Sequence, residues 1–403
     1  MNAVGIDVSK GRSMVAIIRP FGEIVSKPFD IKHTPKELAE LASFILSLEG
    51  ESRVVLENTG KYSDPVVKVL SEAGVFVCPV NAKLIHDYGG DTIRRAKTDK
   101  IDSLKIAGFC LDKWSKLERY SPVDELRKTL KTFNRQLDEY MKVKVMLKNN
   151  LVSLTDQTFP EVNRLFTSPA RESDGHEKWI DFLARFWHCA CITSITEEVF
   201  TGRYKKWCKK HGYNFSSVKA NLIYEAANNQ QPSLSKNGFT KMLILQAVEQ
   251  MNSICLSIAK LKAEMTKIAK MLPEYETVLS MHGVGKTLAP QLIAEIGDIR
   301  RYPKRASLAR FAGIEPPENQ SGAYNQHSRR ISKQGSPQLR KALFQVMRCV
   351  LQNSNLDEDV FRFISRKRSE GKPFKVYMIA GANKFLRIYY ARVKECFDAP
   401  ALA

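Results

Sequence analysis

Four acidic residues near the start of the chain stand where their side chains could bind a metal ion. Asp7 interrupts an apolar strand pattern, and Glu57 ends a second one. A buried, ionised carboxylate is costly unless it is paired or bound to a metal. Asp99 and Asp102 are three residues apart, which places both on one face of a helix. Four such carboxylates could hold the paired Mg²⁺ or Mn²⁺ ions of phosphoryl-transfer enzymes.

Basic residues surround the second acidic pair, as expected where phosphates approach a metal site. They are Arg94, Arg95, Lys97 and Lys100. The competing interpretation is that Asp99 and Asp102 are only solvated residues at a helix start, where capping and the helix dipole favour Asp.

A second candidate group lies near the other end of the chain. Between residues 300 and 348 there are 11 Lys and Arg residues against two acids, which predicts a surface for a polyanion. The candidates for nucleic-acid contact there are Arg329, Arg330, Lys333, Arg340 and Lys341. A polar, glycine-bearing loop in the middle of this segment contains Ser321, which needs a base, a metal or a positive field to act as a nucleophile. A serine beside a glycine is otherwise a common turn.

A glycine turn at 281–286 precedes an apolar helical segment at 288–296. Gly283, Gly285 and Lys286 resemble a helix-hairpin-helix element, whose main-chain N–H groups bind DNA phosphates. The spacing is too short for a nucleotide-binding phosphate loop, and a plain turn between helices is the alternative.

The order of elements that would position the acids is typical of a ribonuclease-H-like α/β domain, a mixed sheet with helices on both faces. Hydrophobic periodicity predicts three hairpin-connected strands, then helix, strand, helix and strand. The predicted ranges are 3–8, 14–18, 23–29, a helix from 34, then 53–57, 64–73 and 75–80.

Long helices are predicted in the middle of the chain. Apolar residues recur in alternating steps of four and three over 126–154, interrupted by Lys144, and again over 244–272. We expect a coiled coil within the chain or with a second subunit; core helices of a globular domain are the alternative. The predicted domains are therefore 1–120, 121–272 with an insert at 160–237, and a mainly helical 273–403.

The bulk composition favours a folded, reduced, nucleic-acid-binding protein. The net charge is +20 over 403 residues, although a basic enzyme of another kind would share it. No signal segment and no apolar stretch of membrane-spanning length are recognised, so we expect a cytoplasmic, nucleoid-associated protein without a membrane partner. The eight cysteines lack a secreted framework. His188, Cys189, Cys191, Cys208 and His211 could bind zinc, but buried thiols are the favoured interpretation.

Seven short motifs in order resemble the DEDD transposases of the insertion-sequence-110 family. They are Gly5-Ile6-Asp7-Val8-Ser9-Lys10, Glu57-Asn58-Thr59-Gly60-Lys61-Tyr62, Lys97-Thr98-Asp99-Lys100-Ile101-Asp102, His282-Gly283-Val284-Gly285, Phe311-Ala312-Gly313-Ile314-Glu315-Pro316, Ser321-Gly322 and Ile331-Ser332-Lys333-Gln334-Gly335. The resemblance covers about 1–155 and 240–390. Asn58 departs from the alanine frequent in the family, and the insert matches no motif.

The resemblance implies a resolvase-like (RuvC-like) N-terminal domain, a coiled-coil middle and a C-terminal transposase domain. It places the family's four acids on Asp7, Glu57, Asp99 and Asp102, and its nucleophilic serine on Ser321. It further implies recombination of donor and target DNA through a covalent phosphoserine, guided by a structured RNA encoded beside the element. Dimers assembling into tetramers are expected, with the acids of one subunit completing the serine site of another.

Two other functions are consistent with the same residues. A resolvase-like, metal-dependent endonuclease would activate water and leave Ser321 structural. A non-enzymatic nucleic-acid scaffold would need neither the acids nor the serine. A covalent protein–DNA adduct would distinguish the recombinase from both.

Overall fold

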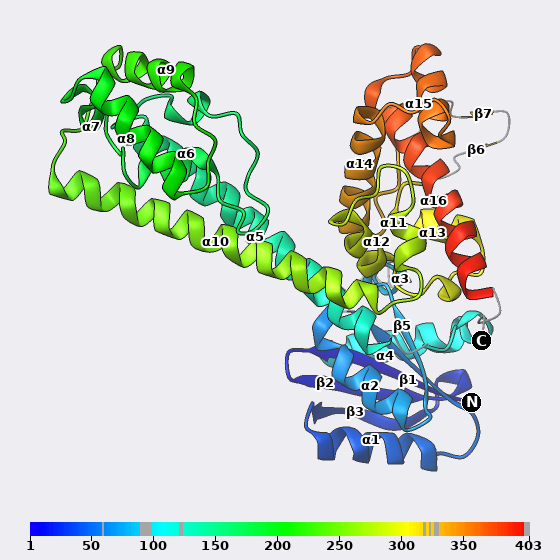
Figure 1. The fold of residues 1–403 in the computed structure, drawn as a ribbon. Coiled ribbons are helices and arrows are strands. Elements are labelled where there is room, and N and C mark those ends of the chain that lie inside the picture. Colours follow the sequence, from blue (N-terminus) through cyan, green and yellow to red (C-terminus); the bar gives the residue numbers. More distant parts are fainter. Residues whose placement is uncertain are drawn as a thin grey trace. The chain divides into compact units, whose positions relative to one another are not determined.

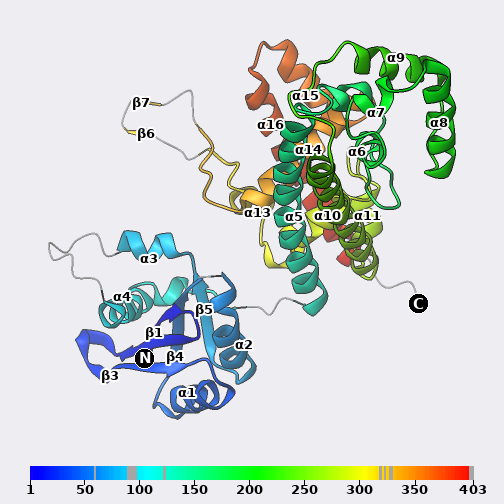
Figure 2. The same ribbon diagram turned by 90° about the vertical axis from the view of Figure 1, so that its left-hand side faces the viewer.

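The computed structural model describes residues 1–58, 60–88, 98–120, 124–316, 320–321, 324–325 and 330–398. The chain divides into two compact units, Met1–Pro122 and Val123–Ala403. Figures 1 and 2 show the two from orthogonal directions. The first unit contains the five-stranded sheet, and the second is almost entirely helical.

The first unit is built on a mixed sheet with the order β3-β2-β1-β4-β5. β1 pairs antiparallel with β2 and parallel with β4, and β4 pairs parallel with β5. The strands are β1 (Asn2–Ser9), β2 (Arg12–Ile18), β3 (Ile24–Lys32), β4 (Ser52–Glu57) and β5 (Phe76–Val80). The predicted mixed α/β arrangement of the N-terminal region is confirmed.

Helices cover both faces of this sheet. α1 (Pro35–Ser47) and α2 (Asp64–Glu72) enclose one hydrophobic cluster, while α3 (Ala82–Tyr88) and α4 (Asp99–Asp112) enclose another on the opposite face. Figure 2 shows this separation, with α4 on one side of the strands and α1 on the other. Side chains alternate between the two faces along β1, so the strand contributes to both clusters: Val4 packs with α1 and Ala3 packs with α4.

Two long antiparallel helices connect the parts of the second unit. α5 (Glu125–Thr155) packs along α10 (Gly238–Lys270): Leu137 shares a cluster with Met265, and Leu151 shares one with Ile244. The apolar repeats of the two helices therefore face each other within one chain. The coiled-coil interpretation of their heptads stays a prediction.

α10 also qualifies the expectation that the chain has no apolar segment of membrane-spanning length. Among the described residues it is the one helix with the length and apolar composition to cross a membrane. Its apolar side chains contribute to both hydrophobic clusters of the second unit. A core helix of a globular protein passes the same test of length and composition, so this feature is weak evidence for a membrane.

The predicted insert forms a small helical lobe at one end of α5 and α10 (Figure 1). Its core is dominated by aromatic side chains, including Phe182, Phe200 and Tyr204, none of which is exposed. The two ends of the lobe meet, because the N–H of Leu234 donates to the carbonyl oxygen of Gln157 at 3.0 Å. The helices are α6 (Lys178–Leu183), α7 (Ala190–Thr193), α8 (Glu197–Lys210) and α9 (Ser217–Asn228).

The C-terminal part of the second unit is a helical body around the largest hydrophobic cluster. Leu130 and Leu137 of α5 enter this cluster, so the body and the long helices share one core. Its elements are α11 (Tyr275–Leu279), α12 (Leu288–Ile296), α13 (Arg305–Ala312), β6 (Gln320–Ser321), β7 (Tyr324–Asn325), α14 (Pro337–Gln352), α15 (Asp359–Ser369) and α16 (Phe374–Asp398).

Candidate active site

Asp7 and Glu57 lie near the ends of two neighbouring parallel strands, on the same face of the sheet. Ile6 lies opposite Leu56 in the β1–β4 register, so the next residue of each strand is an acid. Side chains alternate along a strand, which puts Asp7 on the face of Gly5. By the same alternation, Glu57 lies on the face of Val55, and Val55 packs against α4. Both side chains are half-buried.

The close approach of α4 to β1 brings a third element to these acids. A β-carbon at Gly5 would lie 2.2 Å from the carbonyl oxygen of Ser103 and 2.3 Å from the main-chain nitrogen of Ala107. Farther along α4, the thiol of Cys110 donates to the carbonyl oxygen of Arg53 at 3.4 Å. Since Arg53 lies near the start of β4, α4 runs antiparallel to β1 and β4. Its N-terminus therefore lies at the sheet edge where the two strands end.

Asp99 and Asp102 occupy the first turn of α4, at that edge. The Thr98 side chain caps the helix by accepting from the N–H of Ile101 at 3.3 Å. Asp99 is exposed and Asp102 is half-buried. The predicted position of these acids at a helix start is thus observed, and that position alone would favour acidic residues. Three of the predicted phosphate contacts, Arg94, Arg95 and Lys97, lie outside the described residues, and Lys100 is exposed.

The four acids share an edge without forming a closed metal cage. In the described part of the chain, no three His, Cys, Asp or Glu side chains are grouped closely enough to hold a metal ion. An open set of carboxylate oxygens still fits Mg²⁺, which is usually bound by one or two carboxylates, several waters and substrate phosphates. The donor set is therefore compatible with Mg²⁺ or Mn²⁺ and unsuited to zinc, which prefers Cys and His.

Ser321 lies in the second unit, in the short hairpin formed by β6 and β7. Its register partner is Tyr324, and Gln320 pairs with Asn325. The serine thus lies directly at the turn of a two-stranded hairpin. The acids belong to Met1–Pro122 and the serine to Val123–Ala403, so the two predicted halves of the site are on different units.

The glycine turn at 281–286 joins α11 to α12, as the helix-hairpin-helix resemblance predicts for its position. Gly283 has a φ of +79°, and a β-carbon there would lie 2.5 Å from Cγ2 of Val350 on α14. This glycine is therefore required by backbone conformation and by packing, whatever the turn binds. Gly285 and Lys286 are exposed, and Lys286 is available to a phosphate.

The predicted basic residues of the C-terminal region divide into two groups. Arg340 and Lys341 have structural partners: the Arg340 guanidinium donates to the carbonyl oxygen of Ala312 at 3.0 Å, and Lys341 pairs with Asp138 at 2.7 Å. Arg330 and Lys333 are exposed. Arg329 lies outside the described residues.

A buried carboxylate that the sequence analysis did not single out stabilises the segment after the serine hairpin. Glu295 of α12 is 1% exposed. It accepts from Asn134 and Arg135 of α5, both at 2.8 Å, and from the hydroxyl of Ser336 at 3.0 Å. Ser336 is also the N-cap of α14. Glu295 therefore connects α5, α12 and the start of α14.

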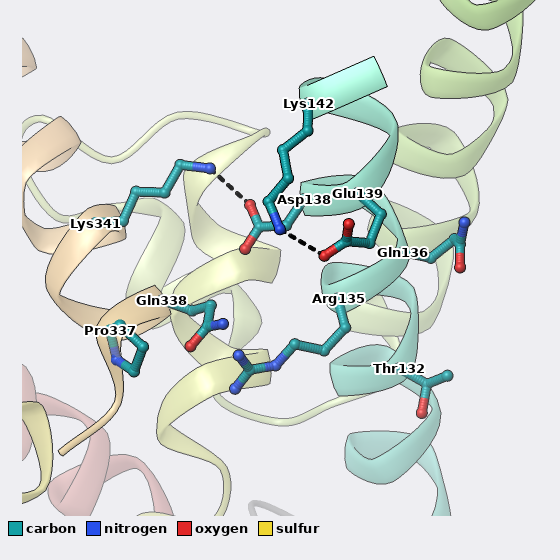
Figure 3. A pocket seen from close by; sticks show the side chains of 9 residues that line it. All are labelled: Thr132, Arg135, Gln136, Asp138, Glu139, Lys142, Pro337, Gln338 and Lys341. Carbon is teal, nitrogen blue, oxygen red and sulfur yellow. Dashed lines mark hydrogen bonds and ion pairs between the residues drawn. The ribbon is translucent and has the colours of Figure 1, made fainter. Parts of the chain in front are cut away.

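A polar hollow of about 380 Å³ lies beside this network, between α5 and α14 (Figure 3). Arg135 and Pro337 both line it. The pair Lys341–Asp138 crosses it from α14 to α5, and the pair Lys142–Glu139 lies along α5 at its wall. Because its cations are already paired with acids, the hollow is better suited to joining two helices than to binding an anion.

The cysteines and histidines of the lobe cluster belong to the core of the lobe or lie against it. Cys189 and Cys208 are buried, and burial raises the pKa of the Cys189 thiol to about 12. His188 accepts from the N–H of Ala190 at 2.9 Å, and the His211 ring stacks on Trp207. Both histidines are thus held by other contacts, and the described residues include no group of three His, Cys, Asp or Glu side chains placed to hold a metal ion.

Comparison with known proteins gives two family matches. A model for DEDD transposases of the IS110 type, described as "Transposase", matches residues 4–160, and one described as "Transposase IS116/IS110/IS902 family" matches 275–360. The first contains all four acids, and the second contains Ser321. Residues 161–274 lie between the two matches.

Individual relatives agree with these matches. The 44.8 kDa protein of insertion element IS116 from Streptomyces clavuligerus is 22% identical over 97% of this chain and 94% of its own length. The pilin gene-inverting protein of Moraxella bovis is 29% identical over 34% of this chain, and the chain spans only 44% of that protein's length. With both family domains present in order and a relative aligned from end to end, the chain belongs to the IS110 family of transposases.

Proposed function

We propose that this transposase cuts and rejoins DNA through a covalent bond between Ser321 and a DNA phosphate, supported by a divalent metal ion at Asp7, Glu57, Asp99 and Asp102. The observation that carries the proposal is the convergence of β1, β4 and the N-terminus of α4 at one sheet edge, each bringing an acid. A resolvase-like origin of the first unit is part of the proposal. Its mixed sheet with helices on both faces supports it.

The proposed reaction exchanges one phosphoester for another. The Ser321 oxygen attacks the scissile phosphorus, the bond to the leaving DNA oxygen breaks, and the serine proton ends on that oxygen as a free DNA hydroxyl. Attack by a hydroxyl of another strand reverses the step, restores the serine and joins new ends. Because each step conserves a phosphoester, strand exchange needs no ATP.

The acids would act by binding and orientation. A bound Mg²⁺ or Mn²⁺ ion would stabilise the negative charge that develops on the phosphate in the transition state. Asp7 and Glu57 are well suited to hold such an ion in a fixed position, because both are on central strands of the sheet. Asp99 and Asp102 depend on the docking of α4, which the close packing at Gly5 fixes.

A structured guide RNA and assembly from dimers into tetramers complete the proposal. The net charge of +20 supports a large polyanionic partner. The location of acids and serine on different units is compatible with an active site that takes its acids from one subunit and its serine from another. Sequencing of nucleic acid that co-purifies with the protein tests the guide. Recovery of no discrete RNA would remove this part of the proposal.

Substitution of Ser321 tests the central step. We expect Ser321→Ala to abolish denaturation-resistant protein–DNA adducts while it leaves DNA binding intact. Adducts formed by the Ala variant at the wild-type level would remove Ser321 from the mechanism. If the wild-type protein instead releases nicked DNA without any adduct, the metal-dependent endonuclease is the better description.

A further inference from the structure

The helical lobe carries an unusual concentration of positive charge on one helix. The second half of α8 has five Lys and Arg residues and no acid within eight positions, namely Arg203, Lys205, Lys206, Lys209 and Lys210. The rest of 160–237 contains six Lys and Arg residues against eight acids. The positive charge of the lobe therefore comes from this half of α8. Neither family match includes it.

The five cations share one side of the helix. The residues between them, Tyr204, Trp207 and Cys208, are buried in the lobe core, while all five cations are exposed. Arg203, Lys206 and Lys210 are spaced by three and four positions, so they form a single stripe. The rise from Arg203 to Lys210 is about 10 Å, or roughly three base-pair steps of a duplex.

These cations lack the acidic partners that several other cations of the second unit possess. Arg171 of the same lobe pairs with Asp174 at 2.7 Å, and Lys148 of α5 pairs with Glu177 at 2.7 Å. Within the described range 124–316, no ion pair involves any of the five α8 cations. The acids of α8, Glu197 and Glu198, are confined to its first turn.

The chemistry of this surface favours a duplex over a single strand. Single-stranded nucleic acids are bound by stacking their bases on exposed aromatic rings. The rings of α8 itself, Phe200, Tyr204 and Trp207, are at most 7% exposed. Phe215 is half-buried, and its ring lies 5.8 Å from the ammonium nitrogen of Lys205. The surface consists of a row of positive charges, and such a row matches the evenly spaced phosphates of a double helix.

We infer that the exposed face of α8 binds the sugar–phosphate backbone of duplex DNA without reading its sequence, as an accessory anchor away from the reacting phosphate. This inference rests on the proposed function only in taking DNA as the duplex that the protein handles. The lobe would increase affinity for DNA of any sequence. Three phosphate contacts through Arg203, Lys206 and Lys210 would contribute about 2.7 to the slope of log affinity against log salt concentration.

The test is a salt titration of DNA binding by the full-length protein in a Ser321→Ala background, so that no covalent adduct contributes. Fluorescence anisotropy of a labelled 30-base-pair duplex of arbitrary sequence measures the affinity from low to high KCl. The test variant is Arg203→Gln/Lys206→Gln/Lys210→Gln. The control, Lys27→Gln/Lys68→Gln/Lys375→Gln, removes the same charge from exposed lysines on β3, α2 and α16.

We expect the test variant to lower the salt slope by two to three and the control to lower it by less than one. Equal slopes for test and control would overturn the inference. A reduction seen with an RNA hairpin of equal length but not with DNA would assign the surface to RNA and also overturn it. Thermal unfolding that matches the wild type shows that the variants fold. Because binding is measured without chemistry, the inference can survive even if no wild-type adduct is ever found.

Discussion

Gly5 of β1 lies against Ser103 of α4 so closely that a β-carbon on the glycine would stand 2.2 Å from the serine carbonyl oxygen. No side chain other than hydrogen fits this contact without moving the helix. Asp99 and Asp102 lie four residues and one residue before Ser103, so their position is set by a glycine two residues before Asp7. This packing contact therefore fixes the position of Asp99 and Asp102 relative to Asp7.

Gly5→Ala should separate the helix from the sheet. We expect a loss of about 1–3 kcal/mol or more in the free energy of unfolding, because the added methyl group overpacks backbone against backbone. Recombination should fall more than stability alone explains, since the acids of α4 move away from Asp7. Urea unfolding and a recombination assay measure the two effects. Gly202→Ala is the control: it lies in a helix with open space around it, so it should be neutral or slightly stabilising.

If the pair binds the metal ion, Asp99→Asn/Asp102→Asn should lower the recombination rate by about a hundredfold or more. Its cost in stability should remain small, about 0.3–1 kcal/mol for each lost helix-start charge. Asp64→Asn/Glu125→Gln removes two exposed first-turn acids from other helices and should match the stability effect while retaining activity. Recombination that persists in the first variant at the level of the second would refute a catalytic role for the pair.

Glu295→Gln should destabilise the second unit by about 3 kcal/mol, at the lower end of the usual range for breaking a buried ion pair because Arg135 is 38% exposed. The amide of glutamine also has only one acceptor oxygen, so it cannot accept from both Asn134 and Arg135 as the carboxylate does. Thermal or urea unfolding measures the loss. Glu139→Gln removes an acid that is 62% exposed and paired only with Lys142, and it should change stability by no more than about 0.5 kcal/mol. Similar effects for both would show that the Glu295 network contributes little.

The buried thiols should be unreactive in the native protein. Burial raises the pKa of Cys110 to about 12, as it does for Cys189, so little thiolate is present at pH 8. Mass spectrometry after brief exposure to a thiol reagent should find both unmodified until denaturant is added. Rapid native labelling of either residue would contradict this burial.

The same shift predicts a loss of stability in alkali. The folded-state pKa of Cys110 lies above the ordinary value of 9.0, so between these values the native protein binds a proton that the unfolded chain has lost. Its contribution to stability is complete below pH 9 and decreases as the pH rises toward 12. Urea unfolding of wild type and Cys110→Ala at several pH values should show a shallower decline for the variant. Parallel curves would mean that this thiol is not the cause.

Much of the first unit could be predicted from hydrophobic periodicity. The strands at 3–8 and 53–57 and the helix start at Thr34 agree with β1, β4 and α1 to within a few residues. The reason is that each strand has a regular apolar pattern and each helix has a capping residue. The anomaly of an acid in such a pattern likewise identified Asp7 and Glu57 as candidate ligands, and the strand register places them at one sheet edge.

Contacts between distant segments could not be predicted in this way. Glu295 is one acid in an apolar helix, and nothing in its neighbourhood indicates that Asn134, Arg135 and Ser336 surround it. Lys341 was expected on a nucleic-acid surface, but its partner Asp138 is about two hundred residues away. The basic residues of α8 were likewise not recognised from the sequence as a group. The structure shows that all five cations are exposed on one side of the helix.

The hydrogen bond between Leu234 and Gln157 closes the lobe at its base, so the chain leaves α5 and returns to α10 at almost the same point. An excursion of this kind can be lengthened, exchanged or removed without changing the path of the helices that support it. The two family domains lie before and after it. A change in the lobe would therefore leave the two family-matched segments, and the residues proposed for strand joining, in place.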